Sequence, residues 1–173
     1  MIDNSLLPDH QKMDSQITFD YSNVGQLLSK KVQENSNKTF LICPGKKTDK
    51  FTYLEFKSLV DKTIKFLKHI DLKKNDKIAL IFHNSPEFLI LYFAGLTMGL
   101  TIVPINPDMA QREIKFIIEN SKSNAVFYVD KLESKINEIS NFYDKIKFKK
   151  IESINDLALS NEDKLEIQNI EVG

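Results

Sequence analysis

Between residues 51 and 128, apolar positions follow two periodicities in turn, and this alternation predicts a layered fold. From Phe56 to Leu67 the apolar residues recur at spacings of three and four, which is typical of one face of an amphipathic helix. Ile78–Phe82 is an unbroken apolar run, which favours a central parallel strand covered on both faces. Helix and strand patterns continue to alternate up to residue 151. The expected fold class is therefore α/β, with helices layered around a mostly parallel sheet.

The same patterns predict the individual elements. The predicted helices cover residues 23–34, 53–70, 86 to about 99 and 131–142, with one more that begins after residue 108. The predicted strands cover residues 39–43, 77–82, 101–105, 125–129 and 145–151, the last of them at an edge of the sheet.

Capping sequences mark three of the helix starts. Thr52 and Glu55 are three residues apart, the spacing of a capping box. Ser85-Pro86 places a good N-cap before a proline at the first helical position. Asp108 is expected to cap the following helix, with Gln111 in the reciprocal position.

Residues 88–103 form an uncharged, mostly apolar run that raises the question of a membrane span. The run has 16 residues, whereas a spanning helix needs roughly 20 apolar residues. Gly95 and Gly99 have a packing explanation, because small residues let a helix approach the sheet closely and Gly99 can end it in a left-handed conformation. The prediction is a buried helix followed at once by a buried strand, with no transmembrane segment.

Composition divides the chain into three parts. Residues 1–20 lack periodicity and are expected to be a flexible lead. Residues 21–151 are expected to form the α/β subdomain. Residues 152–173 contain six carboxylates and only one lysine, with weak periodicity, and are expected to be an acidic linker.

The charge balance and the cysteine content narrow the class of partner. Lys plus Arg equals Asp plus Glu at 24 each, and Arg112 is the sole arginine. Nucleic-acid binding normally uses Arg forks on bases and phosphates, so no nucleic-acid partner is expected. Cys43 is the only cysteine, which excludes an intrachain disulfide and a cysteine-based metal cluster. Together with a polar, acidic N-terminus, this favours a cytoplasmic location.

Candidate catalytic groups are few. The chain has no HExxH, His-x-His or paired-cysteine metal signature, and its five glycines form no phosphate loop. His10 and His69 have structural explanations. His83 follows the predicted central strand, where ligand crevices of α/β proteins open, but no Ser, Cys or carboxylate is placed by spacing to form a relay with it. A packed or solvent-facing His83 is therefore favoured over a catalytic one.

Three further features have plain explanations. Cys43 is more simply a small buried hydrophobe before a turn than a nucleophile. The helix start at Ser85–Glu87 could receive an anion on free N–H groups, but Glu87 already supplies negative charge there. The Lys46–Lys50 run is most simply a solvated loop between extended segments. On chemistry alone, no catalytic, cofactor-binding or metal-binding residue is assigned.

Five sequence blocks, in the expected order, resemble the start of the adenylate-forming enzymes, the superfamily of acyl-CoA synthetases, luciferases and peptide-synthetase adenylation domains. The blocks are Phe51–Phe56, Asp76–Leu80, Asn84–Phe88, Gly99–Pro107 and Glu113–Ala125. The first resembles a T-Y-x-E-L helix start, the third an N-S-P-E-F turn, and the fourth the second core motif of the family. The resemblance covers residues from about 23 to about 130. Its Asn-Pro ending favours acyl- or aryl-CoA ligases.

The resemblance implies the N-terminal subdomain of an acyl-CoA synthetase-like ligase. In that family a carboxylic acid and ATP give an acyl-adenylate and pyrophosphate, with Mg²⁺, and the acyl group then passes to a thiol such as CoA. The family's phosphate loop, ribose-binding acid, Thr–Glu pair and catalytic lysine have no counterpart here, and the loop would follow shortly after Gly173. ATP, Mg²⁺ and CoA are thus expected for a full-length parent, and the chain alone is expected to be inactive.

One position departs from the pattern. In some CoA ligases a basic residue directly after the Asn-Pro pair helps hold a CoA phosphate, but here that position is Asp108. Arg112 is a candidate substitute.

Two alternatives stay open. The chain could be a stand-alone interaction module that docks a partner through its sheet edge or acidic tail, since a truncated sheet leaves apolar surface that association would cover. It could also be a small-molecule α/β protein with a ligand near Asn84 and Asn106.

Overall fold

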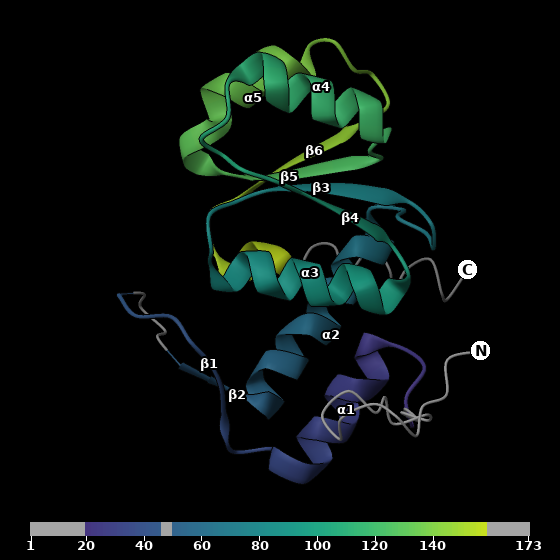
Figure 1. The fold of residues 1–173 in the computed structure, drawn as a ribbon, viewed down its shortest axis with the longest axis vertical. Coiled ribbons are helices and arrows are strands. Elements are labelled where there is room, and N and C mark those ends of the chain that lie inside the picture. Colours follow the sequence, from purple (N-terminus) through teal and green to yellow (C-terminus); the bar gives the residue numbers. More distant parts are fainter. Residues whose placement is uncertain (1–19, 46–49, 159–173) are drawn as a thin grey trace, which may run out of the picture.

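The computed structural model describes residues 20–45 and 50–158, which fold into α/β layers (Figure 1). A four-stranded, fully parallel sheet has the order β4-β3-β5-β6, and a separate antiparallel pair joins β1 and β2. The strands are β1 (Thr39–Ile42), β2 (Lys50–Thr52), β3 (Lys77–Ile81), β4 (Thr101–Ile105), β5 (Ala125–Val129) and β6 (Lys147–Ile151). The helices are α1 (Val24–Asn35), α2 (Tyr53–His69), α3 (Pro86–Met98), α4 (Gln111–Ser121) and α5 (Glu133–Ser140), with short 3₁₀ turns η3 (Asp130–Leu132) and η4 (Ile154–Leu157). The predicted fold class is confirmed.

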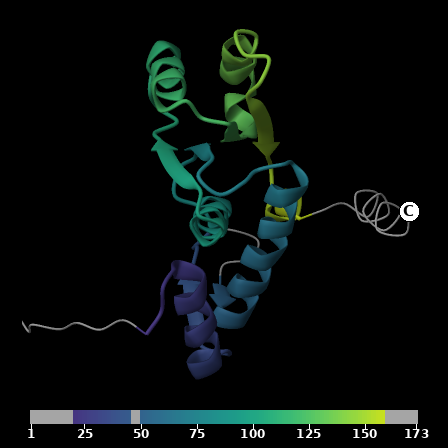
Figure 2. The same ribbon diagram turned by 90° about the vertical axis from the view of Figure 1, so that its right-hand side faces the viewer.

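Strand β3 lies inside the sheet and is covered on both faces. Ile78 and Leu80 pack into one apolar cluster with α2 and α3, while Ala79 and Ile81 pack into a second cluster with α4 and α5. All four side chains are fully buried. Figure 2 shows the same layers from the side, with α4 and α5 on one face of the sheet and α2 and α3 on the other. The unbroken apolar run therefore predicted the central strand correctly.

Helix α3 forms as the sequence predicts. Ser85 Oγ accepts a hydrogen bond from the Phe88 N–H at 3.2 Å, and Pro86 occupies the first turn. Gly99 ends the helix with φ of 74°, a left-handed conformation that glycine adopts without strain. Strand β4 follows two residues later. It is not buried as predicted, because it lies at the edge of the sheet, where only Ile105 is buried and Thr101 and Pro104 are exposed. No helix in the described ranges is both long and apolar enough to cross a bilayer.

Gly95 allows α3 to lie close to the sheet. A Cβ atom at this position would lie 2.5 Å from Ile102 Cδ1 and 3.3 Å from Ile78 Cδ1. The packing explanation of this glycine is therefore confirmed.

The start of α4 differs from the expectation. The N-cap is Ala110 and not Asp108, and the Glu113 carboxylate accepts the Ala110 N–H at 2.8 Å. The Asn106 side chain accepts the Asp108 N–H at 2.9 Å. This local hydrogen bond holds the chain in a turn, so that the helix begins two residues later than predicted.

Strand β2 was not predicted, because it has only three residues and follows a lysine-rich run. Lys50, expected in a loop, begins this strand and pairs with Ile42. Residues 46–49 of that run lie outside the described ranges, as do the lead 1–19 and residues 159–173. The division of the chain at residues 20 and 151 stays a prediction. Within the segment expected to be a linker, η4 contacts α2 and α3, and Leu157 is buried in the apolar cluster beneath them.

The capping box at the start of α2 gives the first testable prediction. Thr52 Oγ1 accepts the Glu55 N–H, and the Glu55 carboxylate accepts the Thr52 N–H at 2.8 Å. Thr52→Ala removes the hydroxyl acceptor, so we expect the free energy of unfolding in urea to fall by about 1 kcal/mol. Ser58→Ala, at an exposed position of the same helix, is the control and should leave stability unchanged or slightly raised. Equal losses in both variants would show that the box does not stabilise α2.

Candidate binding site at the carboxyl edge of the parallel sheet

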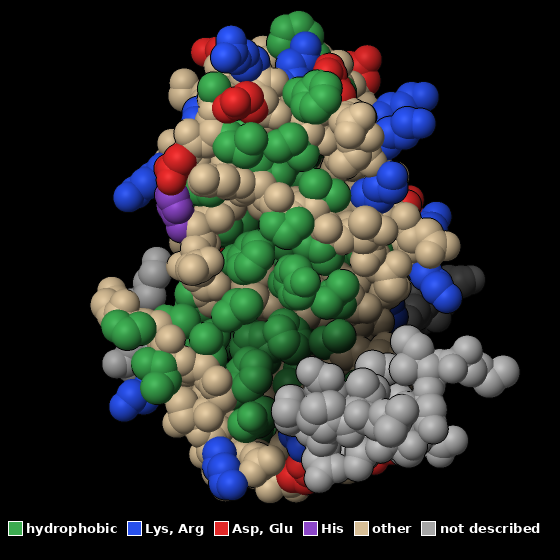
Figure 3. Space-filling model, viewed as in Figure 1, with side chains coloured by type: hydrophobic (Ala, Val, Ile, Leu, Met, Phe, Trp, Pro, Cys, Tyr) green, Lys and Arg blue, Asp and Glu red, His purple; other side chains and the backbone are tan. Residues whose placement is uncertain are grey.

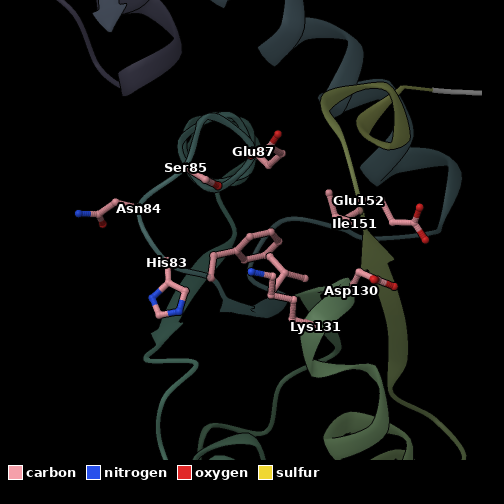
Figure 4. Close-up of a pocket in the computed structure, with 10 residues that line it drawn as sticks. His83, Asn84, Ser85, Glu87, Asp130, Lys131, Ile151 and Glu152 are labelled. Atoms are coloured by element: carbon pink, nitrogen blue, oxygen red, sulfur yellow. The ribbon is translucent and has the colours of Figure 1, made fainter. Parts of the chain in front are cut away.

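A hollow of about 390 Å³ opens where β3, β5 and β6 end (Figure 4). The connection from β3 leads through α3 to β4 on one side, whereas the connection from β5 leads through α5 to β6 on the other side. The two connections cover opposite faces of the sheet. Strands β3 and β5 thus flank the topological switch point, the position where open α/β sheets usually bind their ligands. We call this hollow the switch-point hollow.

Polar side chains from three loops line the switch-point hollow. They come from the end of β3 and the start of α3, from the segment after β5, and from the end of β6, and include His83, Asn84, Ser85, Glu87, Asp130, Lys131 and Glu152. In Figure 4 the Lys131 side chain extends into the hollow towards the end of β3. Lys131 forms no ion pair within the described part of the chain.

Lys150 joins the residues on one side of the hollow, the side formed by β5 and β6. Lys150 Nζ lies 3.0 Å from Glu152 and 3.1 Å from both Asp130 and Glu133, with its side chain 29% exposed. Hydrogen bonds to Glu152, Asp130 and Glu133 raise the pKa of Lys150 well above its ordinary value. The cluster joins β6 to the segment between β5 and α5, and it keeps two more negative charges than positive ones beside the hollow.

His83 has a carboxylate neighbour that the spacing of the sequence did not suggest. Its Nε2 lies 3.5 Å from Asp108 Oδ1, across the ends of β3 and β4. The side chains are 66% and 73% exposed, and a pair so exposed to solvent contributes little energy. The solvent-facing interpretation of His83 therefore agrees with the structure, and its carboxylate neighbour comes from strand order and not from spacing along the chain.

The carboxyl edge is predominantly acidic. The short segments that leave the four strands carry Asp108, Asp130 and Glu152 against a single lysine, Lys131. The first turns of the helices that follow add three carboxylates, Glu87, Glu113 and Glu133, and two cations, Arg112 and Lys135. Carboxylates thus outnumber cations at this edge by six to three. A triphosphate needs several positioned N–H donors and cations. The residues described at this edge do not fit such a group.

A second, apolar hollow of about 460 Å³ lies between the end of β1 and the start of α3. Leu41, Ile42 and Pro44 line one side, and Phe88 and Leu89 line the other. It shares Asn84 and Ser85 with the switch-point hollow, so the two hollows adjoin at the start of α3.

The remaining sequence candidates do not gather at one place. Cys43 lines the apolar hollow and is half-buried, not buried as predicted, because it follows the short edge pair β1–β2 where little covers it. Arg112 is exposed in the first turn of α4 and lines none of these hollows. His69 is exposed near the end of α2, and His10 lies outside the described residues. Residues 20–45 and 50–158 contain no group of His, Cys, Asp and Glu that could hold a metal ion.

The meeting of Asp130, Lys131 and Glu152 with His83 was missed. A signal was available, because each of these residues lies within two positions of the end of a predicted strand of one parallel sheet. Applying the switch-point rule to all strands, and not to His83 alone, would have brought them together.

The fold and the hollow define a domain of the α/β type with its ligand edge at the carboxyl ends of parallel strands. Comparison with known families identifies the family of this domain, because residues 28–170 match the AMP-binding enzyme family. The chain belongs to this family, as the sequence blocks indicated.

Similar proteins agree with this assignment. Crotonobetaine/carnitine–CoA ligases of Escherichia fergusonii and Escherichia coli are 33% identical over 89 residues, which is 50% of this chain and 17% of theirs. The N-terminal domain of FACL13 from Mycobacterium tuberculosis has a TM-score of 0.73 at 25% identity, over 82% of this chain and 38% of that one. A fatty acyl CoA synthetase from Mycobacterium tuberculosis has a TM-score of 0.71 at 26% identity, over 78% of this chain and 28% of that one. The chain thus spans well under half the length of these proteins.

The Lys150 cluster gives the second prediction. Lys150→Met leaves three carboxylates facing one another, so we expect a lower melting temperature than in the parent chain. Because the pKa of Lys150 is raised on folding, its stabilisation is fully present below the ordinary lysine pKa of about 10.4 and is lost only above it. The loss in the variant should therefore be constant from about pH 6 to pH 9.

High salt provides a second test of the same cluster. At about 1 M salt the screening length falls to about 3 Å, so the loss should shrink. Lys149→Met, at the exposed neighbouring position of β6, is the matched control and should change the melting temperature little. The electrostatic account would be contradicted if the melting temperature fell equally in Lys150→Met and in the control. It would also be contradicted if the fall in Lys150→Met did not change with salt.

Proposed function

We propose that this chain is the N-terminal scaffold portion of an ATP-dependent acid–CoA ligase. The parent enzyme joins a carboxylic acid to ATP as an acyl-adenylate and then transfers the acyl group to CoA, using Mg²⁺, in the cytoplasm. The match to the AMP-binding enzyme family over residues 28–170 supports this proposal. The names of its relatives, crotonobetaine/carnitine–CoA ligase and fatty acyl CoA synthetase, favour CoA as the acceptor.

The chain alone does not adenylate a carboxylic acid. The observation that carries this proposal is the acidic carboxyl edge, where the loops contain three carboxylates and one lysine, Lys131. The neighbouring Lys150 is already ion-paired with two of these carboxylates, Asp130 and Glu152. Phosphate charge developing in the transition state would be repelled there, unless other parts of a longer protein supplied cations and N–H donors. The sequence also contains no glycine-rich loop that ends in lysine. The role that remains for this chain is structural: it forms the sheet, the helices that cover it and the turns at its carboxyl edge.

ATP–pyrophosphate exchange tests this directly. With a panel of carboxylic acids, Mg²⁺ and ATP, we expect no exchange above background from the chain alone. A full-length acyl-CoA synthetase, assayed in parallel, shows that the conditions support the reaction. Acid-dependent exchange by this chain would overturn the proposal.

Binding is tested separately from chemistry. The melting temperature of the chain is expected to stay the same with ATP, AMP or CoA, since a ligand raises it only by binding the folded state. A concentration-dependent rise in the melting temperature with one of these three ligands would show that the chain binds it. This result would contradict the prediction even if no exchange were seen.

We also propose that the chain associates through exposed apolar surface. Ile42, at the end of β1, is a large apolar side chain that is 59% exposed. Figure 3 shows apolar side chains continuing across the face over α3 and towards β1. Since α3 carries a single charged residue, Glu87, little opposes its contact with another apolar surface.

Sizing chromatography with light scattering tests the association. We expect a mass above that of one chain at micromolar concentration, and a shift towards the monomer when Ile42→Ser is introduced at the exposed end of β1. Phe142→Ser, on the far side of the sheet beyond α5, is the control. A chain that stays monomeric at all concentrations would count against association.

A further inference from the structure

A third hollow, of about 590 Å³, lies at the opposite, amino edge of the sheet. It is bounded by the end of α2, the loop that enters β3 and the end of α3. The apolar side chains in it are Ile64, Leu72 and Met98, and its lysines are Lys68, Lys73 and Lys74. Asp71 and Thr97 also line it, and three lysines thus face one carboxylate. We call it the amino-edge groove. It shares no residue with the switch-point hollow or the apolar hollow.

The charge around the amino-edge groove is opposite to that of the carboxyl edge. The segments that enter the four strands (71–77, 99–101, 122–125 and 141–147) contain six lysines and three aspartates. In Figure 3, Lys and Arg side chains lie along the right-hand edge, where the strands of Figure 1 begin. A net-neutral chain therefore concentrates positive charge at this edge.

Two of the groove lysines have no carboxylate partner in the described part of the chain. Lys73 lies 3.0 Å from Asp71, but no ion pair involves Lys68 or Lys74. The stem of Lys74 lies against Gly99, whose absent Cβ would be 3.1 Å from Lys74 Cγ. This contact holds the stem beside the end of α3, near Met98, while the ammonium group remains available.

We propose that the amino-edge groove binds an anionic amphiphile, a molecule with a carboxylate or phosphate head and a single apolar chain. The head lies between the ammonium groups of Lys68 and Lys74, and the apolar chain packs on Ile64 and Met98. An apolar floor beside unpaired cations suits such a ligand, because burial of the chain adds to the attraction of the head. This site goes beyond the proposed ligase function and does not depend on it.

The test is a titration of the ¹⁵N-labelled full chain, followed by NMR, with dodecanoate and with dodecyl phosphate below their micelle concentrations. We expect saturable shifts of amides at Lys68, Leu72–Lys74 and Met98. Whichever amphiphile binds more tightly identifies the head group. Dodecyltrimethylammonium, which has the same chain and the opposite charge, should produce no saturable shift at these amides.

Paired variants assign the charge. Lys68→Gln with Lys74→Gln should weaken binding about tenfold, since two charge-assisted contacts are lost. Lys62→Gln with Lys65→Gln removes the same charge from the exposed part of α2 outside the groove and should leave the affinity within about twofold. Met98→Gln should also weaken binding, because it removes apolar surface on which the apolar chain of the ligand packs. Well-dispersed spectra show that each variant is folded.

Three results would overturn the proposal: no saturable shift with either anionic amphiphile, equal binding of the cationic amphiphile, or equal loss in the two double-lysine variants. Each can be observed whether or not the chain supports adenylation, so failure here is distinct from failure of the proposed function.

Discussion

The two-sided burial of β3 is the constraint on which the rest of the structure depends. Its apolar side chains can leave water only if helices cover both faces of the sheet. The connection after β3 supplies α3 for one face, and the connections after β4 and β5 supply α4 and α5 for the other. Because the faces are covered by connections that leave β3 and β5 in opposite directions, a hollow necessarily opens between the ends of these two strands.

The same topology explains the opposite charges of the two edges. Helices that follow parallel strands begin at the carboxyl edge, where the partial positive charge of their N-termini lies. Glu87, Glu113 and Glu133 occupy the first turns of α3, α4 and α5 and stabilise these ends. Lysines gather at the other edge, and Lys147 Nζ donates to the backbone carbonyl of Ile70 just after α2. The carboxylates that stabilise the helix starts thus make the carboxyl edge a poor place for phosphates. The lysines of the amino edge lie mostly in its loops, because α3, α4 and α5 have no basic residue in their last turns.

The sequence predicted those elements whose signals are local. The run Ile78–Phe82 and the caps at Thr52 and Ser85 were sufficient to place β3, α2 and α3, because periodicity and capping act over a few residues. The expected start of α4 at Asp108 was wrong, since the Asn106 side chain competes for the Asp108 N–H. Strand β2 is too short to show a period, and only its pairing with β1 defines it.

The candidate site was harder to predict, because its contacts join residues far apart in the chain. The approach of His83 to Asp108 spans the whole of α3 and β4, and Lys150 meets Asp130 only because β5 and β6 are neighbours. Neither contact follows from spacing along the chain. Both follow from strand order, which the alternation of helices and strands leaves undetermined.

Hydrogen–deuterium exchange of the backbone amides tests the central role of β3 most directly. If the sheet is organised around this doubly covered strand, the amides of β3 and β5 exchange most slowly, and those of the β1–β2 pair exchange much faster. Protection of the β1–β2 pair equal to that of β3, or rapid exchange throughout β3, would contradict the account.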